Sequence, residues 1–116
     1  MKRLIALSLL AATLAVVPLG LAARESGKAT TIKVSASEFK FALSKKSAPH
    51  GTVVFTVVNK GHISHDFKIA GKKTPLVKPR GKATLRVTLA KGKRYRYICT
   101  VPGHVTLGMK GTFRST

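Results

Sequence analysis

The side chains best suited to chemistry are concentrated in one stretch near the C-terminus, Cys99-Thr-Val-Pro-Gly-His104-Val-Thr-Leu-Gly-Met109. It contains the only cysteine of the chain, one of its four histidines and the only methionine other than Met1. A thiol, an imidazole and a thioether at intervals of five residues are donors that suit a soft or borderline metal ion. The spacing therefore predicts a metal site, and a buried, inert thiol is the alternative reading of Cys99.

Two imidazoles, one thiolate and one weak axial thioether make up the ligand set of a blue copper site. The soft sulfur atoms favour Cu(I), and the imidazoles accommodate Cu(II). The stretch supplies one imidazole, so the second must come from another segment. His65 is the candidate because it alternates with Phe67 and Ile69 and so faces the core. His62 is the alternative, and zinc is a weaker candidate for the ion because a thioether is a poor zinc ligand.

Alternation of apolar and polar residues along most of the chain predicts the β-strands that must position these donors. Because side chains two residues apart on a strand share a face, Cys99 lies with Tyr95 and Tyr97, and Met109 lies in phase with Phe113. Short strands with regular turns and no helical periodicity indicate an all-β fold, a Greek-key β-sandwich or barrel of about seven or eight strands. The alternating runs are residues 32–35, 39–43, 53–58, 65–69, 84–89, 94–99 and 109–113.

Residues 99–111, together with the upstream segment 59–67, resemble the cupredoxins, the family that includes plastocyanin, azurin and rusticyanin. The Cys-x4-His-x4-Met spacing is similar to that of rusticyanin, and the nearest resemblance is to small exported copper-binding cupredoxins of bacteria. The resemblance covers residues 30–114 and implies a Greek-key sandwich with one type 1 copper at its loop end. The ligands it implies are His65, Cys99, His104 and Met109.

Members of this family often carry asparagine directly after the first histidine, where this chain has Asp66. Either side chain could bond to the loop at Thr100 and hold the two ligand-bearing segments together. Asp66 carries a negative charge where asparagine would carry none. The sequence therefore predicts the copper site but does not predict its reduction potential. His50 lies between Pro49 and Gly51, far from the motif, and is expected to be a turn residue.

The N-terminus has the pattern of a secretory signal peptide. Lys2 and Arg3 precede a largely apolar run, and Ala22-Ala23 supplies small residues for cleavage. A retained membrane anchor is the alternative, since about 18 apolar residues could just span a bilayer. We predict a signal peptide at 1–23, a short tether at 24–31 and a cupredoxin-like domain at 32–116. The protein is then exported, to the periplasm or to the extracellular space or cell surface.

The chain is strongly basic, with 22 lysines and arginines against three acidic residues and a formal net charge of +19. Without residues 1–23 the net charge is +17. A field of this strength favours an anionic partner. Nucleic acid is not expected, because export is predicted and the chain has no basic helix or nucleic-acid-binding motif. An acidic redox protein, such as a cytochrome or an oxidase, or an anionic membrane or cell-wall surface fits better, and solubility alone is the alternative.

Four protein donors leave no clear open position for a substrate, which catalytic metal sites require, so an enzyme is not expected. We predict a monomeric one-electron carrier. The family resemblance implies that electrons leave through the edge of His104, which reaches the surface through an apolar patch. The residues that could form this patch are Val101, Pro102, Val105 and Leu107. The alternatives are a copper storage or delivery protein with the same ligands, and a metal-free sandwich that binds anionic polymers. Delivery is disfavoured because the chain has no Met-rich or His-rich tract.

Overall fold

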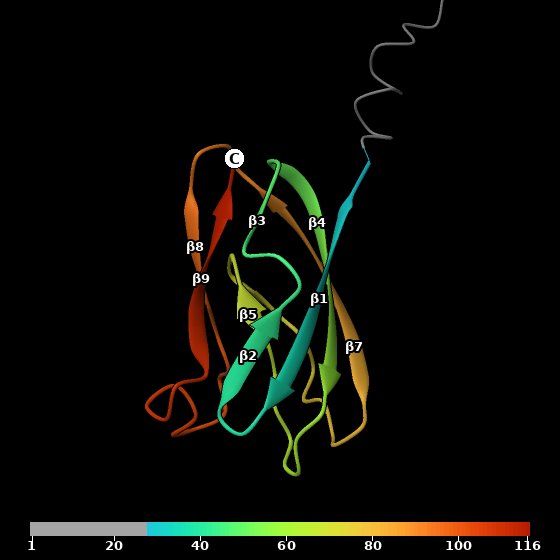
Figure 1. Ribbon diagram of the computed structural model, residues 1–116, viewed down its shortest axis with the longest axis vertical. Coiled ribbons are helices and arrows are strands. Elements are labelled where there is room, and N and C mark those ends of the chain that lie inside the picture. The colour runs from blue at the N-terminus through green and yellow to red at the C-terminus, as the bar shows by residue number, and fades with distance from the viewer. Residues whose placement is uncertain (1–27) are drawn as a thin grey trace, which may run out of the picture.

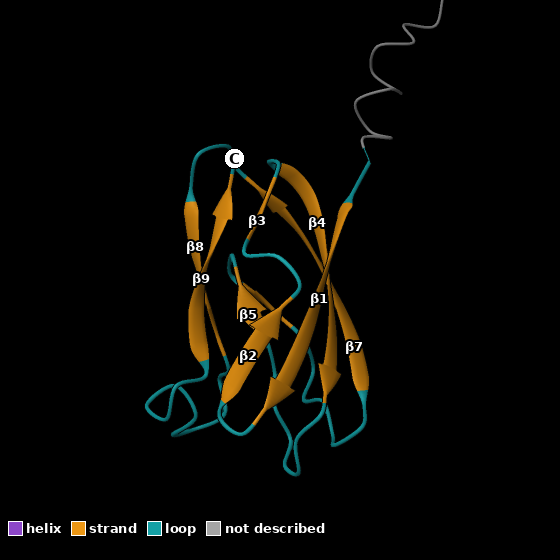
Figure 2. Cartoon of the chain, in the orientation of Figure 1, coloured by secondary structure: helices purple, strands orange, loops and turns teal. Residues whose placement is uncertain are grey.

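The structure, a computed structural model, describes residues 28–116. The predicted signal peptide at 1–23 and the first half of the predicted tether at 24–31 lie outside this range. Residues 28–116 form nine strands in two facing sheets and contain no helix (Figures 1 and 2). Within them, accordingly, no helix is long and apolar enough to cross a membrane. The predicted all-β sandwich is confirmed.

The strands are arranged in one sheet of four and one sheet of five. In spatial order, the first sheet contains β2 (Lys40–Leu43), β1 (Thr30–Ser37), β4 (Gly51–Asn59) and β7 (Lys82–Leu89). The second contains β3 (Ser47–Ala48), β9 (Lys110–Ser115), β8 (Arg94–Ile98), β5 (Lys68–Ile69) and β6 (Lys72–Lys73). Seven strands fall on the predicted runs, although only Lys68–Ile69 of the run at 65–69 forms a strand. The other two, β3 and β6, have two residues each, too few to produce an alternating pattern.

β1 begins two residues before the predicted domain boundary. Thr30 and Thr31 pair in parallel with Val53 and Val54 of β4 and so belong to the strand rather than to the tether. Threonine is β-branched and suits a strand, but two adjacent threonines give no alternation from which a strand could be predicted. The parallel pairing, which no local pattern reveals, supplies their backbone partners.

The core lies between the two sheets and is built from the inward-facing residues of both. Three fully buried phenylalanines meet at its centre, Phe55 from β4, Phe67 just before β5 and Phe113 from β9. The ring centroid of Phe55 lies 5.1 Å from that of Phe67 and 5.2 Å from that of Phe113. Burial of each such side chain stabilises the fold by about 1.5–3 kcal/mol. Phe67 is therefore firmly anchored, and it fixes the segment that carries His65 two residues earlier.

Four connections meet at one end of the sandwich, the lower end in Figure 1. They are the turn from β1 to β2 at residues 38–39, the segment after β4 at residues 60–67, the connection from β6 to β7 at residues 74–81 and the loop from β8 to β9 at residues 99–109. β1 and β4 run parallel, so both deliver their C-terminal ends here. We call this the cysteine end, because it contains Cys99.

Candidate metal centre

Three of the four predicted ligands converge at the cysteine end. The donor atoms of His65, Cys99 and His104 all lie within 4.8 Å of one another. Nδ1 of His65 is 3.2 Å from Nδ1 of His104, which is 3.5 Å from Sγ of Cys99. His65 and Cys99 are completely buried, and His104 is 7% exposed. Within residues 28–116 no second group of this kind is present.

Met109, the fourth predicted ligand, is completely buried in the same core cluster as Cys99. Its backbone N–H donates to the carbonyl of His104, and its carbonyl accepts from the N–H of Cys99, both at 3.1 Å. These bonds bring Met109 back beside the two other donors of its loop. The prediction that Met109 points inward, in phase with Phe113, is confirmed.

The remaining histidines lie outside this cluster. His62, the alternative to His65, is exposed. His65 instead forms an isolated bridge with Val77, with backbone N–O distances of 3.1 and 2.7 Å. His50 is an exposed turn residue between β3 and β4, as predicted, and its Nδ1 lies 3.0 Å from the carbonyl oxygen of Thr116.

The loop between β8 and β9 folds back by hydrogen bonds within itself. The N–H of His104 donates to Val101 at 3.1 Å, and the N–H of Leu107 donates to His104 at 3.2 Å. Gly103 and Gly108 have φ angles of 84° and 118°, a region that favours glycine. The chain thus turns at Pro102-Gly103 and again at Leu107-Gly108, and these turns return it twice toward the donors.

Asp66 joins the His65 segment to this loop. The backbone N–H of Thr100 donates to Oδ1 of Asp66 at 2.6 Å, and the hydroxyl of Thr100 donates to Oδ2. The bond predicted between these two residues is confirmed. The strand phase that directs His65 to the core would turn Asp66 outward, but the Asp66 side chain is buried, and Thr100 satisfies both of its oxygens. The residues that follow His65 and Cys99 are therefore locked together.

Glu38, which the sequence did not single out, also belongs to the site. Its Oε1 accepts hydrogen bonds from the backbone N–H groups of His62 at 2.8 Å and Ile63 at 3.0 Å, and lies 3.0 Å from Nε2 of His65. Burial by itself would raise the pKa of Glu38, but the hydrogen bonds from Ile63, His62 and His65 and from its own backbone together outweigh it and lower the pKa to about 2. The ionised carboxylate can only accept, so Nε2 of His65 carries the proton. One signal was available, since Glu38 is one of only three acidic residues in the chain.

Asn59 and Gly61 shape the segment around Glu38. The buried amide of Asn59 donates to the carbonyls of Ile63 and Val77, both at 2.8 Å, and accepts from the N–H of Gly61 at 2.8 Å. A Cβ atom on Gly61 would collide with the carboxylate of Glu38. Glycine at this position therefore leaves the space that the carboxylate of Glu38 occupies.

The protonation of the donors follows from their burial. Burial lowers the pKa of His104, and the neighbouring His65 lowers it further, so the imidazole is held in the neutral form that binds metals. Burial raises the pKa of the Cys99 thiol. A metal ion that binds there must displace the thiol proton. Two imidazole nitrogens, a thiol and a buried thioether are donors that fit copper.

Comparison with known proteins places this site in a family. The sequence profile of the copper-binding proteins of the plastocyanin/azurin family matches residues 27–114, about three quarters of the chain. The chain therefore belongs to the plastocyanin/azurin family of copper-binding proteins, and the resemblance to cupredoxins is confirmed. Family and cluster together define a type 1 copper site with a His2CysMet donor set. Among curated protein sequences, none matches the chain significantly.

Solved structures of blue copper proteins share the fold. Dithionite-reduced auracyanin from the photosynthetic bacterium Roseiflexus castenholzii has a TM-score of 0.66 and 23% identity, covering 78% of this chain and 99% of that one. Auracyanin A, a "blue" copper protein from Chloroflexus aurantiacus, has a TM-score of 0.64 and 21% identity, covering 77% and 100%. A chain in a heme-copper terminal oxidase dimer has a TM-score of 0.63 and 18% identity, covering 79% and 67%. At these identities the likeness concerns the fold alone.

Proposed function

We propose that this protein is an exported one-electron carrier in which His65, Cys99, His104 and Met109 hold one type 1 copper. The observation that carries the proposal is the convergence of three buried donor atoms, all within 4.8 Å of one another, beside a buried methionine. Copper, when bound, accepts and releases a single electron. The four side chains would hold it, and a donor set of four protein ligands would leave no clear open position for a substrate, which supports a carrier without catalytic activity.

The framework around these side chains supports electron transfer, because it holds them in one arrangement. Backbone bonds connect His65 to Val77 and Cys99 to Met109, and Asp66 connects the two segments through Thr100. Ligands fixed by such contacts move little when the charge of the ion changes. A small rearrangement is what a carrier needs in order to exchange electrons quickly.

The proposed route by which electrons pass to a partner is the edge of the His104 ring, because His104 is the least buried of the four proposed ligands. Three large apolar side chains are exposed among residues 28–116: Ile63, Leu76 and Leu107. Each lies beside the site, since Ile63 donates to Glu38, Leu107 donates to His104, and Leu76 directly precedes Val77, the partner of His65. Together with the predicted patch on the loop, they provide the apolar contact area that a short-lived redox complex uses.

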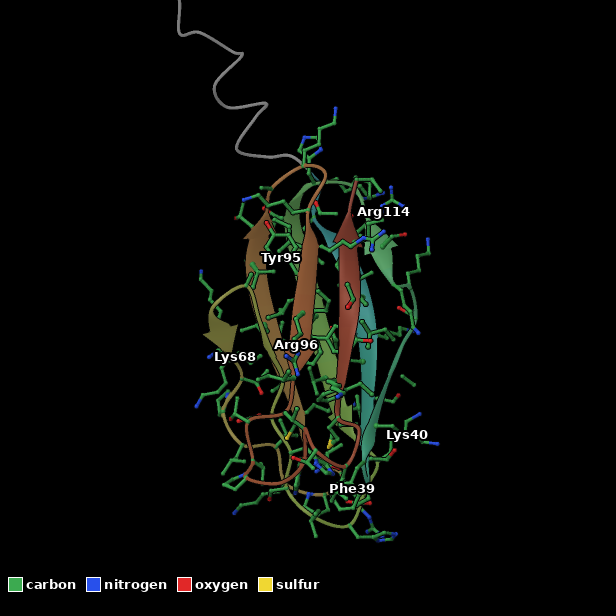
Figure 3. All side chains as sticks on the ribbon, turned by 90° about the vertical axis from the view of Figure 1, so that its left-hand side faces the viewer. Phe39, Lys40, Lys68, Tyr95, Arg96 and Arg114 are labelled. Carbon is green, nitrogen blue, oxygen red and sulfur yellow. The ribbon has the colours of Figure 1, made fainter. Side chains whose placement is uncertain are left out.

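The outer face of the five-stranded sheet supports an acidic redox protein as the partner. Three arginines project from this face, which Figure 3 turns toward the reader. Arg94 lies opposite Arg114, and Arg96 follows two residues later on β8. Lys110 and Lys68 extend the same face, on either side of Ile98. Like charges directly opposite one another do not stabilise a sheet, so sheet stability does not explain this arrangement. An acidic cytochrome or oxidase would be attracted to it, and the attraction would raise the association rate.

Export to the periplasm or cell surface is supported by the signal-like pattern of residues 1–23. Cell fractionation followed by N-terminal sequencing of the mature protein tests it. A mature chain that begins near Arg24 supports cleavage, whereas a membrane-bound chain that begins at Met1 supports the anchor.

The carrier function is tested by adding one equivalent of Cu(II) to the mature protein and recording the visible spectrum and a voltammogram. We expect intense blue absorption, lost in Cys99→Ser and retained with a shifted maximum in Met109→Leu. Repeated oxidation and reduction should leave the copper bound. Loss of copper on reduction would instead favour storage or delivery, and a colourless mixture would contradict the type 1 site.

A further inference from the structure

The acidic residues of this basic protein are not spread over its surface. Residues 28–116 contain 19 lysines and arginines but only two acidic residues, Glu38 and Asp66. Both lie at the cysteine end, and each contacts a segment that carries a proposed copper ligand. Asp66 bonds to the backbone and hydroxyl of Thr100, which accounts for it as a brace between two segments. Glu38 contacts an imidazole itself, and the predicted electron-carrier function does not account for that contact.

The carboxylate of Glu38 lies on the far edge of the His65 ring from the other donors. Nδ1 of His65 faces Nδ1 of His104 at 3.2 Å, whereas Nε2 faces Oε1 of Glu38 at 3.0 Å. The ring is completely buried, and the side chain of Glu38 is 25% exposed, so the carboxylate lies between the ring and solvent. A proton held on Nε2 by an acceptor leaves the lone pair of Nδ1 free for a metal.

The position of Glu38 is itself fixed from several sides. The same Oε1 atom accepts from the N–H groups of His62 and Ile63, so three donors point at one oxygen. Gly61 leaves the space that the carboxylate fills, and Asn59 holds the segment in its closed shape. A surface glutamate that only improved solubility would not need such a setting.

We propose that Glu38 is a positioning residue for the copper site: it fixes the ring and tautomer of His65 through Nε2, and its negative charge lowers the reduction potential. The inference rests on the proposed function. The charge acts on the copper through a single, completely buried imidazole, and interactions across such a ring are screened less than those between exposed charges. A nearby negative charge favours Cu(II) over Cu(I), in opposition to the surrounding lysines and arginines.

Two substitutions separate the two roles. In Glu38→Gln, the amide oxygen can still accept all three hydrogen bonds, so the ring stays in place and only the charge is lost. We expect the visible spectrum to stay close to that of the wild type and the reduction potential to rise. In Glu38→Ala the partner of Nε2 is lost as well. We expect an altered spectrum and copper retention against a chelator that is weaker by about 10–100-fold, as for other residues that support metal ligands.

Thr112→Lys is the matched control, because it adds the same positive charge on the outer face of β9, opposite Arg96. Its reduction potential should rise less than that of Glu38→Gln, and its spectrum should not change. If the two potentials rise equally, the proposed effect of the Glu38 charge is wrong. If Glu38→Ala keeps the wild-type spectrum and copper retention, the proposed positioning role is wrong.

A measurement on the wild-type protein guards against variants that fail to fold. Long-range ¹H–¹⁵N NMR spectra of the metal-free protein should show the proton of His65 on Nε2, protected from exchange. A proton on Nδ1 instead would overturn the inference. Because this measurement needs no copper, it is separate from the proposed function, whereas a wild-type protein that never turns blue would refute that function and leave the Glu38–His65 contact intact.

Discussion

The two imidazoles of the copper site are held in different ways. His65 is completely buried, and its contacts come from distant parts of the chain, through Glu38 and Val77. His104 reaches the surface, and its backbone bonds stay within its own loop, to Val101, Leu107 and Met109. The backbone of His65 is therefore positioned by the whole fold and that of His104 by its own loop, although the His104 ring also packs edge-on against Phe39. In the proposed electron carrier, His65 would then anchor the metal and His104 would present it to partners.

The sharpest test of this comparison removes each ring in turn. We expect His65→Gly and His104→Gly both to lose the blue absorption, because each removes a strong donor. External imidazole should restore most of the absorption in His104→Gly, since that position opens to solvent. It should not do so in His65→Gly, where the cavity is enclosed. Visible titration with imidazole measures both, and equal rescue of the two variants would refute the proposed division of roles.

The next largest effect is expected from the brace between the two segments. Asp66→Ala leaves the N–H and hydroxyl of Thr100 without their acceptor, which should lower the free energy of unfolding by about 1–3 kcal/mol. Asp66→Asn keeps one acceptor oxygen and should lose less. Urea unfolding of the metal-free variants gives the comparison. Stability unchanged in Asp66→Ala would show that the two histidine segments do not depend on each other.

A smaller effect, confined to the surroundings of His65, is expected from Gly61→Ala. The added methyl group displaces the carboxylate of Glu38, so the setting of His65 should change while that of His104 does not. Crowding of this kind destabilises by about 1–3 kcal/mol, and the reduction potential should shift in the same direction as in Glu38→Gln. Gly71→Ala is the control, because its φ of 75° makes alanine unfavourable there while nothing crowds the added methyl group. It should lower stability and leave the potential unchanged.

The smallest effect is expected in the dependence of stability on pH, and it comes from the carboxylate of Glu38, which contacts His65. The pKa of Glu38 is about 2 in the folded protein against an ordinary value of 4.5. The stabilisation from ionised Glu38 is therefore present in full above pH 4.5 and is lost as the pH falls toward 2. Urea midpoints of the metal-free protein across this range should decline less steeply in Glu38→Gln than in the wild type. Parallel declines would show that Glu38 is not stabilised by its bonds to residues 62, 63 and 65.

The difference between contacts within one loop and contacts between distant segments also explains which site residues could be predicted from the sequence. His104, Cys99 and Met109 lie within eleven residues, so spacing and strand phase were enough to bring them together. The phase of His65 with Phe67 also sufficed to choose it over His62. Asp66 could be paired with Thr100 because each directly follows a proposed ligand.

Glu38 could not be placed from sequence, because 27 residues separate it from His65. The parallel register of β1 and β4, which aligns Ala36 with Asn59, brings them together, and local patterns do not specify strand register between distant strands. The side chain of Asn59 is likewise fully buried and satisfied by hydrogen bonds, which its polar character does not predict. Both residues act through tertiary contacts, which alternation and spacing do not encode.

The concentration of apolar surface at the cysteine end, on a domain that is otherwise strongly cationic, has a consequence for copies of the protein itself. Two identical molecules could exchange an electron only by bringing their cysteine ends together, and their large like charges oppose that approach. Self-exchange should therefore be slow in dilute buffer and become faster as added salt screens the repulsion. An electron held by one molecule would then pass to an oppositely charged acceptor rather than circulate among its neighbours.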